Sequence, residues 1–407
     1  MNCSTDPGRV VVIGTGLAGT RLARRVGAAA VLIGEEAHAP YNRVLLAEVL
    51  AGSYGADVIA LPRHTGTHLR TRAVRIDRDE QVVRCEDGSD VPYDTLVLAT
   101  GSNPVLPPLR GLFAPGAAEL PGGVHAFRTM DDCLALSRAV VPGVRAVVVG
   151  GGLLGVSAAR ALARRGAQVV LTQQSERLME RQLDPRSSRL VHEHLTARGV
   201  EVHTQCRVRG VGVVDGAVRS VELADGYVLD TDLTVLACGV RPRTGLALAA
   251  GLDVREGIVV DDDLRTSDPR VRAVGDCAQH AGRVYGLATP AVEQADALAE
   301  NLLSGRRRPY AGTRTLTRLT LPHEAGPLDL AAFGETEALP GDDVVQLADA
   351  TRGTYRKVVV RGDRLVGGVL VGELGTVGAL ARAWEADDPL PDDGAPLLHL
   401  LTHDGGL

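Results

Sequence analysis

A glycine-rich segment occurs twice in the chain, and this internal repeat constrains the fold more than any other feature. Residues 9–19 read RVVVIGTGLAG, and residues 145–155 read RAVVVGGGLLG. In each copy an apolar, β-branched run leads into glycines spaced as G-x-G-x-x-G and then into residues that favour a helix. Residues 93–101 and 231–239 close the two copies with a second apolar run that ends in glycine. We therefore predict two related units, each with a strand, a helix, a second strand, a small meander and a final strand.

The repeat predicts an α/β protein with two Rossmann-like dinucleotide-binding domains, the second of which is inserted in the first. Apolar-alternating stretches broken by Asp-Gly turns, at residues 82–91 and 208–228, supply the meander of each copy. After Pro309 the pattern changes to short alternating runs and a helical stretch at 376–385, which predict a separate α+β module. The expected limits are residues 9–110 and 241–308 for the first domain, 111–240 for the second and 309–407 for the C-terminal module.

The three glycines of the first copy are typical of a pyrophosphate-binding turn. Gly14 allows a tight turn, Gly16 lets the backbone approach the pyrophosphate, and Gly19 lets the following helix pack closely on the sheet. We expect this helix to begin near Leu17, so that the N–H groups of Leu17 and Ala18 face the phosphates.

An acidic residue follows the second predicted strand of the first copy, residues 30–33. Glu35 stands 21 residues beyond Gly14, where a carboxylate can accept hydrogen bonds from the ribose of an adenosine. Glu36 takes this role if the strand ends one residue later.

Three further segments resemble the two-dinucleotide-binding flavoprotein reductases. They are residues 33–48 (IGEEAHAPYNRVLLAE), 98–104 (LATGSNP) and 274–278 (VGDCA). Within that family the chain is most similar to the flavin module of the assimilatory nitrite reductase large subunit and to rubredoxin and ferredoxin reductases. The resemblance covers nearly the whole chain, and it implies FAD in the first domain and NADH or NADPH in the second.

The resemblance also implies roles for residues outside the glycine turns. Asp276 would bond the ribityl chain, although it could instead cap a helix that follows, and Arg43 would lie near the pyrophosphate or the isoalloxazine. Glu293 and Gln294 stand in the family's flavin-facing helix, where each could equally face solvent. The remaining expected FAD contacts are Val83, Ala99, Thr100 and Gly101.

The second copy keeps the phosphate turn but changes its surroundings. Gly150, Gly152 and Gly155 repeat the glycine spacing, and the helix is expected to begin with Leu153 and Leu154. The closing Gly239 belongs to the same site by resemblance.

Two positions of the second copy depart from the family. Gln173 replaces the acid that binds the ribose, so nothing there repels a 2′-phosphate, and Arg177 lies close enough in sequence to pair with one. Ser157 replaces a glutamate that the family usually carries near the flavin and the nicotinamide. The sequence thus leaves open whether NADH or NADPH binds, and whether the second site is used at all.

These features predict an FAD-dependent NAD(P)H oxidoreductase with no catalytic residue beyond the flavin. We expect hydride to pass from nicotinamide to flavin and electrons to pass on to a redox protein or subunit, such as a ferredoxin, a rubredoxin or a nitrite-reducing partner. Residues 45–47 read LLA, where the family's peroxide and disulfide reductases place a reactive cysteine. The alternatives are a biosynthetic dehydrogenase or oxidase of a small organic substrate, which Ser157 and Gln173 favour, and a flavin-binding sensor without turnover.

Composition disfavours other classes of partner. The net charge of −6 offers no general attraction for nucleic acid or anionic lipid. Because the first eight residues are polar and no apolar run reaches the length of a membrane span, we expect a cytoplasmic protein. The six cysteines are widely separated and show no metal-ligand spacing, so no metal site is expected. The C-terminal module would pack near the flavin and contribute to a homodimer, by resemblance.

Overall fold

The computed structural model describes residues 7–114, 116, 119–304, 307–322, 326–390 and 401. The chain divides into two compact units, each built from segments that are far apart in sequence. The first unit contains the chain up to Val105, Arg128–Cys133 and Val240–Thr313, and the second contains Leu106–Phe127, Leu134–Gly239 and the chain from Arg314. One boundary falls inside α3 (Met130–Ala139).

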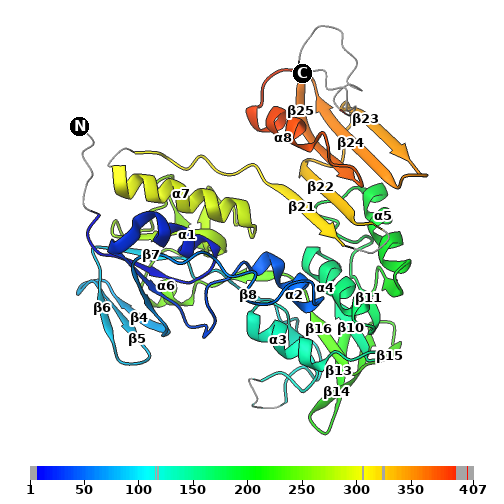
Figure 1. Ribbon diagram of the computed structural model, residues 1–407, viewed down its shortest axis with the longest axis horizontal. Coiled ribbons are helices and arrows are strands. Elements are labelled where there is room, and N and C mark those ends of the chain that lie inside the picture. The colour runs from blue at the N-terminus through cyan, green and yellow to red at the C-terminus, as the bar shows by residue number, and fades with distance from the viewer. Residues whose placement is uncertain are drawn as a thin grey trace. The chain divides into compact units, whose positions relative to one another are not determined.

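A five-stranded parallel sheet forms the centre of the first unit (Figure 1). Its order is β19 (Val271–Ala273), β7 (Thr95–Leu98), β1 (Val10–Ile13), β2 (Ala30–Ile33) and β3 (Thr67–Leu69). All four residues of β1 are buried apolar side chains, as expected for a central strand covered on both faces. Helix α1 (Leu17–Val26) connects β1 to β2 and packs against α7 (Ala288–Ser304).

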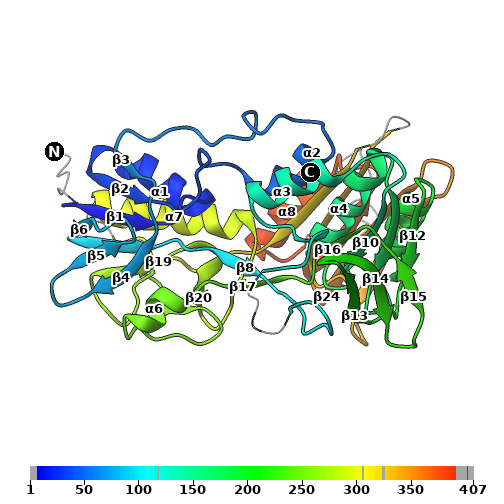
Figure 2. The ribbon, with the colours of Figure 1, turned by 90° about the horizontal axis from the view of Figure 1, so that it is seen from below.

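Smaller elements complete the first unit. An antiparallel meander lies beside the parallel sheet in both views (Figure 2) and consists of β4 (Ala73–Asp77), β5 (Val82–Cys85) and β6 (Asp90–Pro92). Two-stranded ladders join β8 (Ser102–Pro104) to β17 (Val240–Pro242) and β18 (Ile258–Val260) to β20 (Ala278–His280). The short helices are η1 (Gly27–Ala29), η2 (Arg43–Leu45), α2 (Leu46–Leu50), α6 (Gly245–Ala249) and η3 (Gly275–Cys277).

The second unit repeats the same arrangement. Its parallel sheet has the order β12 (Val200–His203), β11 (Gln168–Thr172), β10 (Arg145–Val149), β16 (Leu233–Leu236) and β9 (Val124–Ala126). Its helices are α4 (Leu153–Arg164) and α5 (Pro185–Thr196), and its meander is β13 (Val208–Val214), β14 (Ala217–Leu223) and β15 (Val228–Asp230). The register of β10 with β11 and β16 matches that of β1 with β2 and β7, so the sequence repeat is also a structural repeat.

An antiparallel sheet with one helix forms the C-terminal part of the second unit. The strand order is β21 (Leu316–Leu321), β22 (Leu328–Gly334), β25 (Arg364–Val371), β24 (Thr354–Arg361) and β23 (Asp343–Asp349), and the helix is α8 (Val377–Ala386). α8 packs on β22 and β25, where the ring centroids of Trp384 and Phe333 lie 5.3 Å apart.

A buried polar cluster joins this C-terminal sheet to α5. Asp184 caps the start of α5, and its carboxylate accepts hydrogen bonds from Ser187, from Tyr355 at 2.7 Å and from Lys357 at 3.3 Å. Burial alone would raise the pKa of Asp184, but the hydrogen bonds from Ser187 and Tyr355 outweigh it and hold that pKa below the ordinary value. Lys357 is the single lysine of the chain.

The fold class predicted from the repeat is confirmed: two Rossmann-like units and a C-terminal α+β module are present. The predicted strand at residues 30–33 coincides with β2, the helix starts expected at Leu17 and Leu153 match those of α1 and α4, and the stretch predicted at 376–385 differs from α8 by one residue at each end. The alternative in which Asp276 caps a helix is wrong, because the element that follows it is strand β20. The domain limits stay a prediction. Within the described residues, no helix has both the length and the apolar character to cross a lipid bilayer.

Candidate cofactor sites

In the first glycine turn, two of the three glycines lie against backbone atoms and the third faces open space. Gly14 has φ 118°, and a Cβ there would lie 2.1 Å from the carbonyl oxygen of Ala99. A Cβ on Gly19 would lie 2.0 Å from the carbonyl oxygen of Gly14. A Cβ on Gly16, in contrast, would meet no described atom within 4 Å. The outer glycines are therefore required for packing, whereas the middle glycine leaves space in front of the turn.

The start of α1 is suited to an anion. The helix begins at Leu17, followed by Ala18, and its first turn contains no acidic residue. Gly16 is the N-cap residue of α1, and among the described residues no side chain forms a capping hydrogen bond there. The N-terminal amides and the helix dipole can therefore interact with a phosphate, and the residues present fit the pyrophosphate of a dinucleotide.

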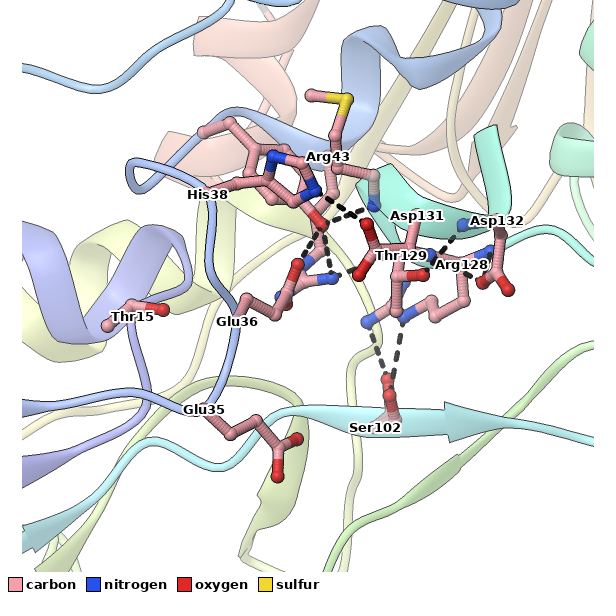
Figure 3. Close-up of polar contacts among 12 residues, drawn as sticks. Thr15, Glu35, Glu36, His38, Arg43, Ser102, Arg128, Thr129, Asp131 and Asp132 are labelled. Atoms are coloured by element: carbon pink, nitrogen blue, oxygen red, sulfur yellow. Dashed lines mark hydrogen bonds and ion pairs between the residues drawn. The ribbon is translucent and has the colours of Figure 1, made fainter. Parts of the chain in front are cut away.

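Both candidate ribose acids lie beyond β2, and each is paired with an arginine: Glu35 with Arg243, and Glu36 with Arg43, of which only the second pair is drawn in Figure 3. Glu35 accepts hydrogen bonds from Arg243, one of them at 2.9 Å, which hold the pKa of Glu35 below its usual range although partial burial acts the other way. Glu36 pairs with Arg43 and accepts a hydrogen bond from Tyr41 at 2.6 Å. The side chain of Glu35 is 39% exposed and that of Glu36 only 15%, so Glu35 is the more accessible of the two.

Arg43 belongs to a network that also includes the chain just before α3. Arg43 donates to the Tyr41 hydroxyl at 2.9 Å and to the carbonyl of Arg128 at 3.2 Å. The Tyr41 hydroxyl in turn accepts a hydrogen bond from the amide of Met130 at 2.8 Å. Residues 36–43 and 128–130, which are far apart in sequence, thus lie side by side (Figure 3).

Asp276 is held by two residues that the sequence analysis missed. Arg128 donates to the Asp276 carboxylate at 2.7 Å, and the Ser102 hydroxyl donates to the same oxygen at 2.9 Å. Arg128 also donates to the Ser102 hydroxyl at 2.7 Å. The side chains of Arg128 and Asp276 are 21% and 18% exposed, so this ion pair is half-buried.

One sequence signal could have located Arg128. Thr129 and Asp132 form a reciprocal cap of α3, in which Asp132 accepts from the amide of Thr129 at 2.8 Å and donates its own amide to the Thr129 hydroxyl at 3.1 Å. The pattern T-x-x-D before an apolar run marks a helix start, and Arg128 immediately precedes it. Nothing in the local sequence indicates that this arginine faces Asp276.

The turn after β7 is tied to the same region of the first unit. The Thr100 hydroxyl donates to the carbonyl of Arg243 at 2.6 Å, and the carbonyl of Gly101 accepts from the amide of Arg243 at 2.9 Å. Gly101 has φ 70°, which favours glycine. Ala99, Thr100 and Gly101 therefore lie beside the partner of Glu35.

Three other expected FAD contacts differ in their surroundings. Gln294 is 1% exposed and accepts a hydrogen bond from the amide of Gly275 at 2.7 Å, so it holds the turn that carries Asp276. Glu293 is exposed and accepts from Thr313 at 2.5 Å. Val83 is fully buried in the core, in the middle strand of the meander. The roles of Glu293 and Val83 toward FAD stay predictions.

The second glycine turn reproduces the first. Gly150 has φ 110°, and a Cβ there would lie 2.5 Å from the carbonyl oxygen of Ala237. A Cβ on Gly155 would lie 1.7 Å from the carbonyl oxygen of Gly150, whereas a Cβ on Gly152 would meet no described atom within 4 Å. Helix α4 starts with Leu153 and Leu154, and its first turn has no acid. This site therefore also fits a pyrophosphate.

The two departures from the family have local structural explanations. Gln173 accepts a hydrogen bond from the amide of Gly151 at 2.8 Å and donates to the carbonyl of Arg177 at 3.3 Å. The Ser157 hydroxyl donates to the carbonyl of Leu153, one turn earlier in α4, at 2.8 Å. The closing Gly239 has φ 99°.

The cysteine nearest to this closing turn is unsuited to nucleophilic chemistry. Burial raises the pKa of Cys238 to about 11, and its thiol lies 3.5 Å from the carbonyl of Val149. Across the described residues, no group of three histidine, cysteine or acidic side chains is placed to hold a metal ion.

Comparisons with known proteins give consistent matches. Residues 8–295 match the family described as pyridine nucleotide-disulphide oxidoreductase, and residues 326–386 match the rubredoxin NAD+ reductase C-terminal domain. The chain is 33% identical over 378 residues to an NAD(P)H nitrite reductase of Bacillus subtilis, covering 90% of this chain and 46% of the relative. It is 32% identical over 291 residues to a rubredoxin-NAD(+) reductase of Pseudomonas putida, covering 68% of this chain and 74% of the relative.

A solved structure matches over nearly its full length. It is the covalent putidaredoxin reductase–putidaredoxin complex, with a TM-score of 0.81, 28% identity and coverage of 96% of this chain and 97% of that one. The chain spans less than half the length of the first four curated relatives that it matches, the nitrite and nitrate reductase proteins.

Proposed function

The chain belongs to the pyridine nucleotide-disulphide oxidoreductase family, and on that premise we propose that it moves hydride from NADH or NADPH to FAD and passes the electrons to a redox protein or a partner subunit. Membership confirms the predicted resemblance, the oxidoreductase class and the use of FAD with a nicotinamide nucleotide. The observation that carries the proposal is the pair of glycine turns, one in each unit, in which only Gly16 and Gly152 are open.

FAD would be held in the first unit by the start of α1 and by residues from several other segments. Gly14, Gly16 and Gly19 with the amides of Leu17 and Ala18 would bind the pyrophosphate, and Glu35 would accept from the adenosine ribose. The other proposed contacts are Glu36, Arg43, Val83, Ala99, Thr100, Gly101, Asp276 and Glu293, together with Arg128. Because Arg128 and Ser102 use one oxygen of Asp276, the second oxygen could accept a ribityl hydroxyl.

The nicotinamide nucleotide would be held in the second unit. Gly150, Gly152 and Gly155 with the amides of Leu153 and Leu154 would bind its pyrophosphate. Gln173 and Gly239 would lie beside the rest of the nucleotide. We propose residues 9–110 with 241–308 as the FAD domain, 111–240 as the nicotinamide domain and 309–407 as the C-terminal module.

The protein residues supply position and hydrogen bonds to this reaction. Bound FAD supplies the hydride acceptor and can release electrons singly or in pairs. We assign no nucleophile or general base, because the transferred group is a hydride. The burial of Cys238 and the sequence Leu-Leu-Ala at residues 45–47 both argue against a thiol mechanism.

The proposed electron acceptor is a small redox protein or a reductase subunit. The relatives include a rubredoxin-NAD(+) reductase and an assimilatory nitrate reductase electron transfer subunit, and the structural match was solved as a complex with putidaredoxin. We do not assign nitrite reduction to this chain, because it matches less than half of the nitrite reductase relatives. A homodimer and a cytoplasmic location stay predictions.

Rapid mixing of the purified holoprotein with NADH or NADPH tests the proposal. We expect the visible absorbance band of oxidised flavin to disappear after mixing. The band should return when a ferredoxin or a rubredoxin is added. If neither nucleotide bleaches the flavin while a small organic metabolite does, the proposal fails and the alternative dehydrogenase or oxidase reading takes its place. A flavin that stays oxidised with every donor would favour a sensor.

A further inference from the structure

The loop that follows β11 in the second unit contains Arg177, whose charge is balanced by nearby carboxylates. Nη2 of Arg177 lies 2.7 Å from the carboxylate of Glu337 and 3.9 Å from that of Glu180. Its side chain is only 20% exposed. Glu337 comes from the C-terminal segment between β22 and β23, which the sequence alone does not connect with a nucleotide site.

The same loop is fixed against the glycine turn. Gln173 bonds the amide of Gly151 with its oxygen and the carbonyl of Arg177 with its nitrogen, so Arg177 lies directly beside the end of β11. In this fold the end of the second strand faces the adenosine ribose, where the 2′ substituent distinguishes NADH from NADPH. The charge at this position therefore acts on the one substituent by which the two nucleotides differ.

We infer that the second site selects NADH over NADPH, and that Glu337 of the C-terminal module is a residue that determines this selectivity by engaging Arg177. The inference rests on the proposed function. A 2′-phosphate carries almost two negative charges and needs a free cation or a bidentate arginine partner. At this site it would have to displace Glu337 from Arg177 and would face Glu180 as well. A 2′-hydroxyl carries no charge, and it can bond to the Gln173 side chain without separating the ion pair.

Steady-state kinetics with both nucleotides test the inference in four proteins. For the wild type we expect kcat/KM to be at least about tenfold higher with NADH than with NADPH. Glu337→Gln should shift the NADPH to NADH ratio of kcat/KM toward NADPH by about two- to fivefold, the scale of an ion pair whose carboxylate is 59% exposed. Adding Arg177→Met to Glu337→Gln should abolish that gain. Glu385→Gln, which removes an exposed carboxylate of α8 in the same module, should leave the ratio unchanged.

The NADPH to NADH ratio of kcat/KM distinguishes a change in selectivity from a loss of stability, because a destabilised protein would lose activity with both nucleotides alike. A wild type that uses NADPH as well as NADH, or a Glu337→Gln variant with the wild-type ratio, would overturn the inference.

Calorimetric binding of 5′-ADP and 2′,5′-ADP to the same four holoproteins separates this inference from the proposed function. Tighter binding of 5′-ADP, with a gap that closes in Glu337→Gln, upholds the selectivity even if neither nucleotide reduces the flavin, in which case only the proposed function fails. Absence of binding by both fragments overturns the inference.

Discussion

Replacing Gly19 by alanine should destabilise the first unit by disturbing the contact between α1 and the glycine turn. A Cβ at this position would lie 2.0 Å from the carbonyl oxygen of Gly14 and 3.1 Å from its carbon. Because both are backbone atoms at the start of the helix, relief requires α1 to move by about 1 Å within a densely packed core. Overpacking against backbone atoms at this distance falls in the upper part of the usual range, about 2–3 kcal/mol, and the higher helix propensity of alanine offsets about 1 kcal/mol of this. The expected net loss in the free energy of unfolding is about 1–2 kcal/mol.

Gly16→Ala is the matched control, because it should weaken the binding of FAD while leaving the stability of the apoprotein nearly unchanged. No described atom lies within 4 Å of the added Cβ, and the backbone at φ −71°, ψ −171° is extended and accessible to alanine. We expect the apoprotein to lose less than about 1 kcal/mol, the scale of a weaker helix cap. The methyl group would occupy the space through which the pyrophosphate approaches, so the affinity for FAD should fall at least about tenfold.

Urea unfolding of the apoproteins followed by circular dichroism, and quenching of flavin fluorescence on binding, measure the two effects separately. Equal stability of Gly19→Ala and the wild type would show that α1 does not need the close approach seen in the structure. Wild-type FAD affinity in Gly16→Ala would show that the open side of the turn is not the cofactor side, and the reasoning about this site would be wrong.

Four further predictions concern charged and titratable groups. Arg128→Met should raise the Kd for FAD at least about tenfold, because Asp276 loses its half-buried cation; an unchanged Kd in the fluorescence assay would remove Arg128 from the site. Lys357→Met should lower the free energy of unfolding at neutral pH by about 3 kcal/mol, because it breaks a buried ion pair. The pKa of Asp184 is lower in the folded protein, so the stabilising contribution of its carboxylate is complete above the ordinary pKa of 3.8 and is lost as the pH falls through the lower folded pKa. As the pH is lowered below about 4, the urea midpoint of Asp184→Asn should therefore fall less steeply than that of the wild type. Because burial raises the pKa of Cys238 to about 11, iodoacetamide at pH 8 should label it only after unfolding, and rapid labelling of the native protein, read by mass spectrometry, would contradict this.

Much of the fold could be predicted because its determinants are local in sequence. The run of β-branched residues in β1 and β10, the glycine spacing after each strand and the Asp-Gly turns of the meanders each dictate backbone geometry within a few residues. The glycines show this most clearly: positive φ at Gly14 and Gly150, and the missing Cβ at Gly19 and Gly155, are demanded by the turn itself. The same logic placed the helix start at Leu17.

The partners of the charged residues required the tertiary structure. The family resemblance implied that Asp276 is a ligand, but the sequence did not indicate that Arg128, 148 positions earlier, would hold it. The sequence analysis placed Gln173 where the family has its ribose-binding acid, and the structure adds the bonds of Gln173 to Gly151 and Arg177. The contacts of Asp276 with Arg128 and of Gln173 with Gly151 join segments that come together only when the sheets form.

The amino-acid sequence by itself determined the two dinucleotide folds, the α+β module after them and the glycine turns, because periodicity and backbone conformation depend on neighbouring residues. Only the tertiary structure decided which arginine neutralises which carboxylate: Arg128 with Asp276, Arg243 with Glu35 and Arg177 with Glu337. Charge pairing depends on distance in space, and in a chain with 43 arginines and 50 acidic residues the sequence allows far more pairs than the fold can bring together.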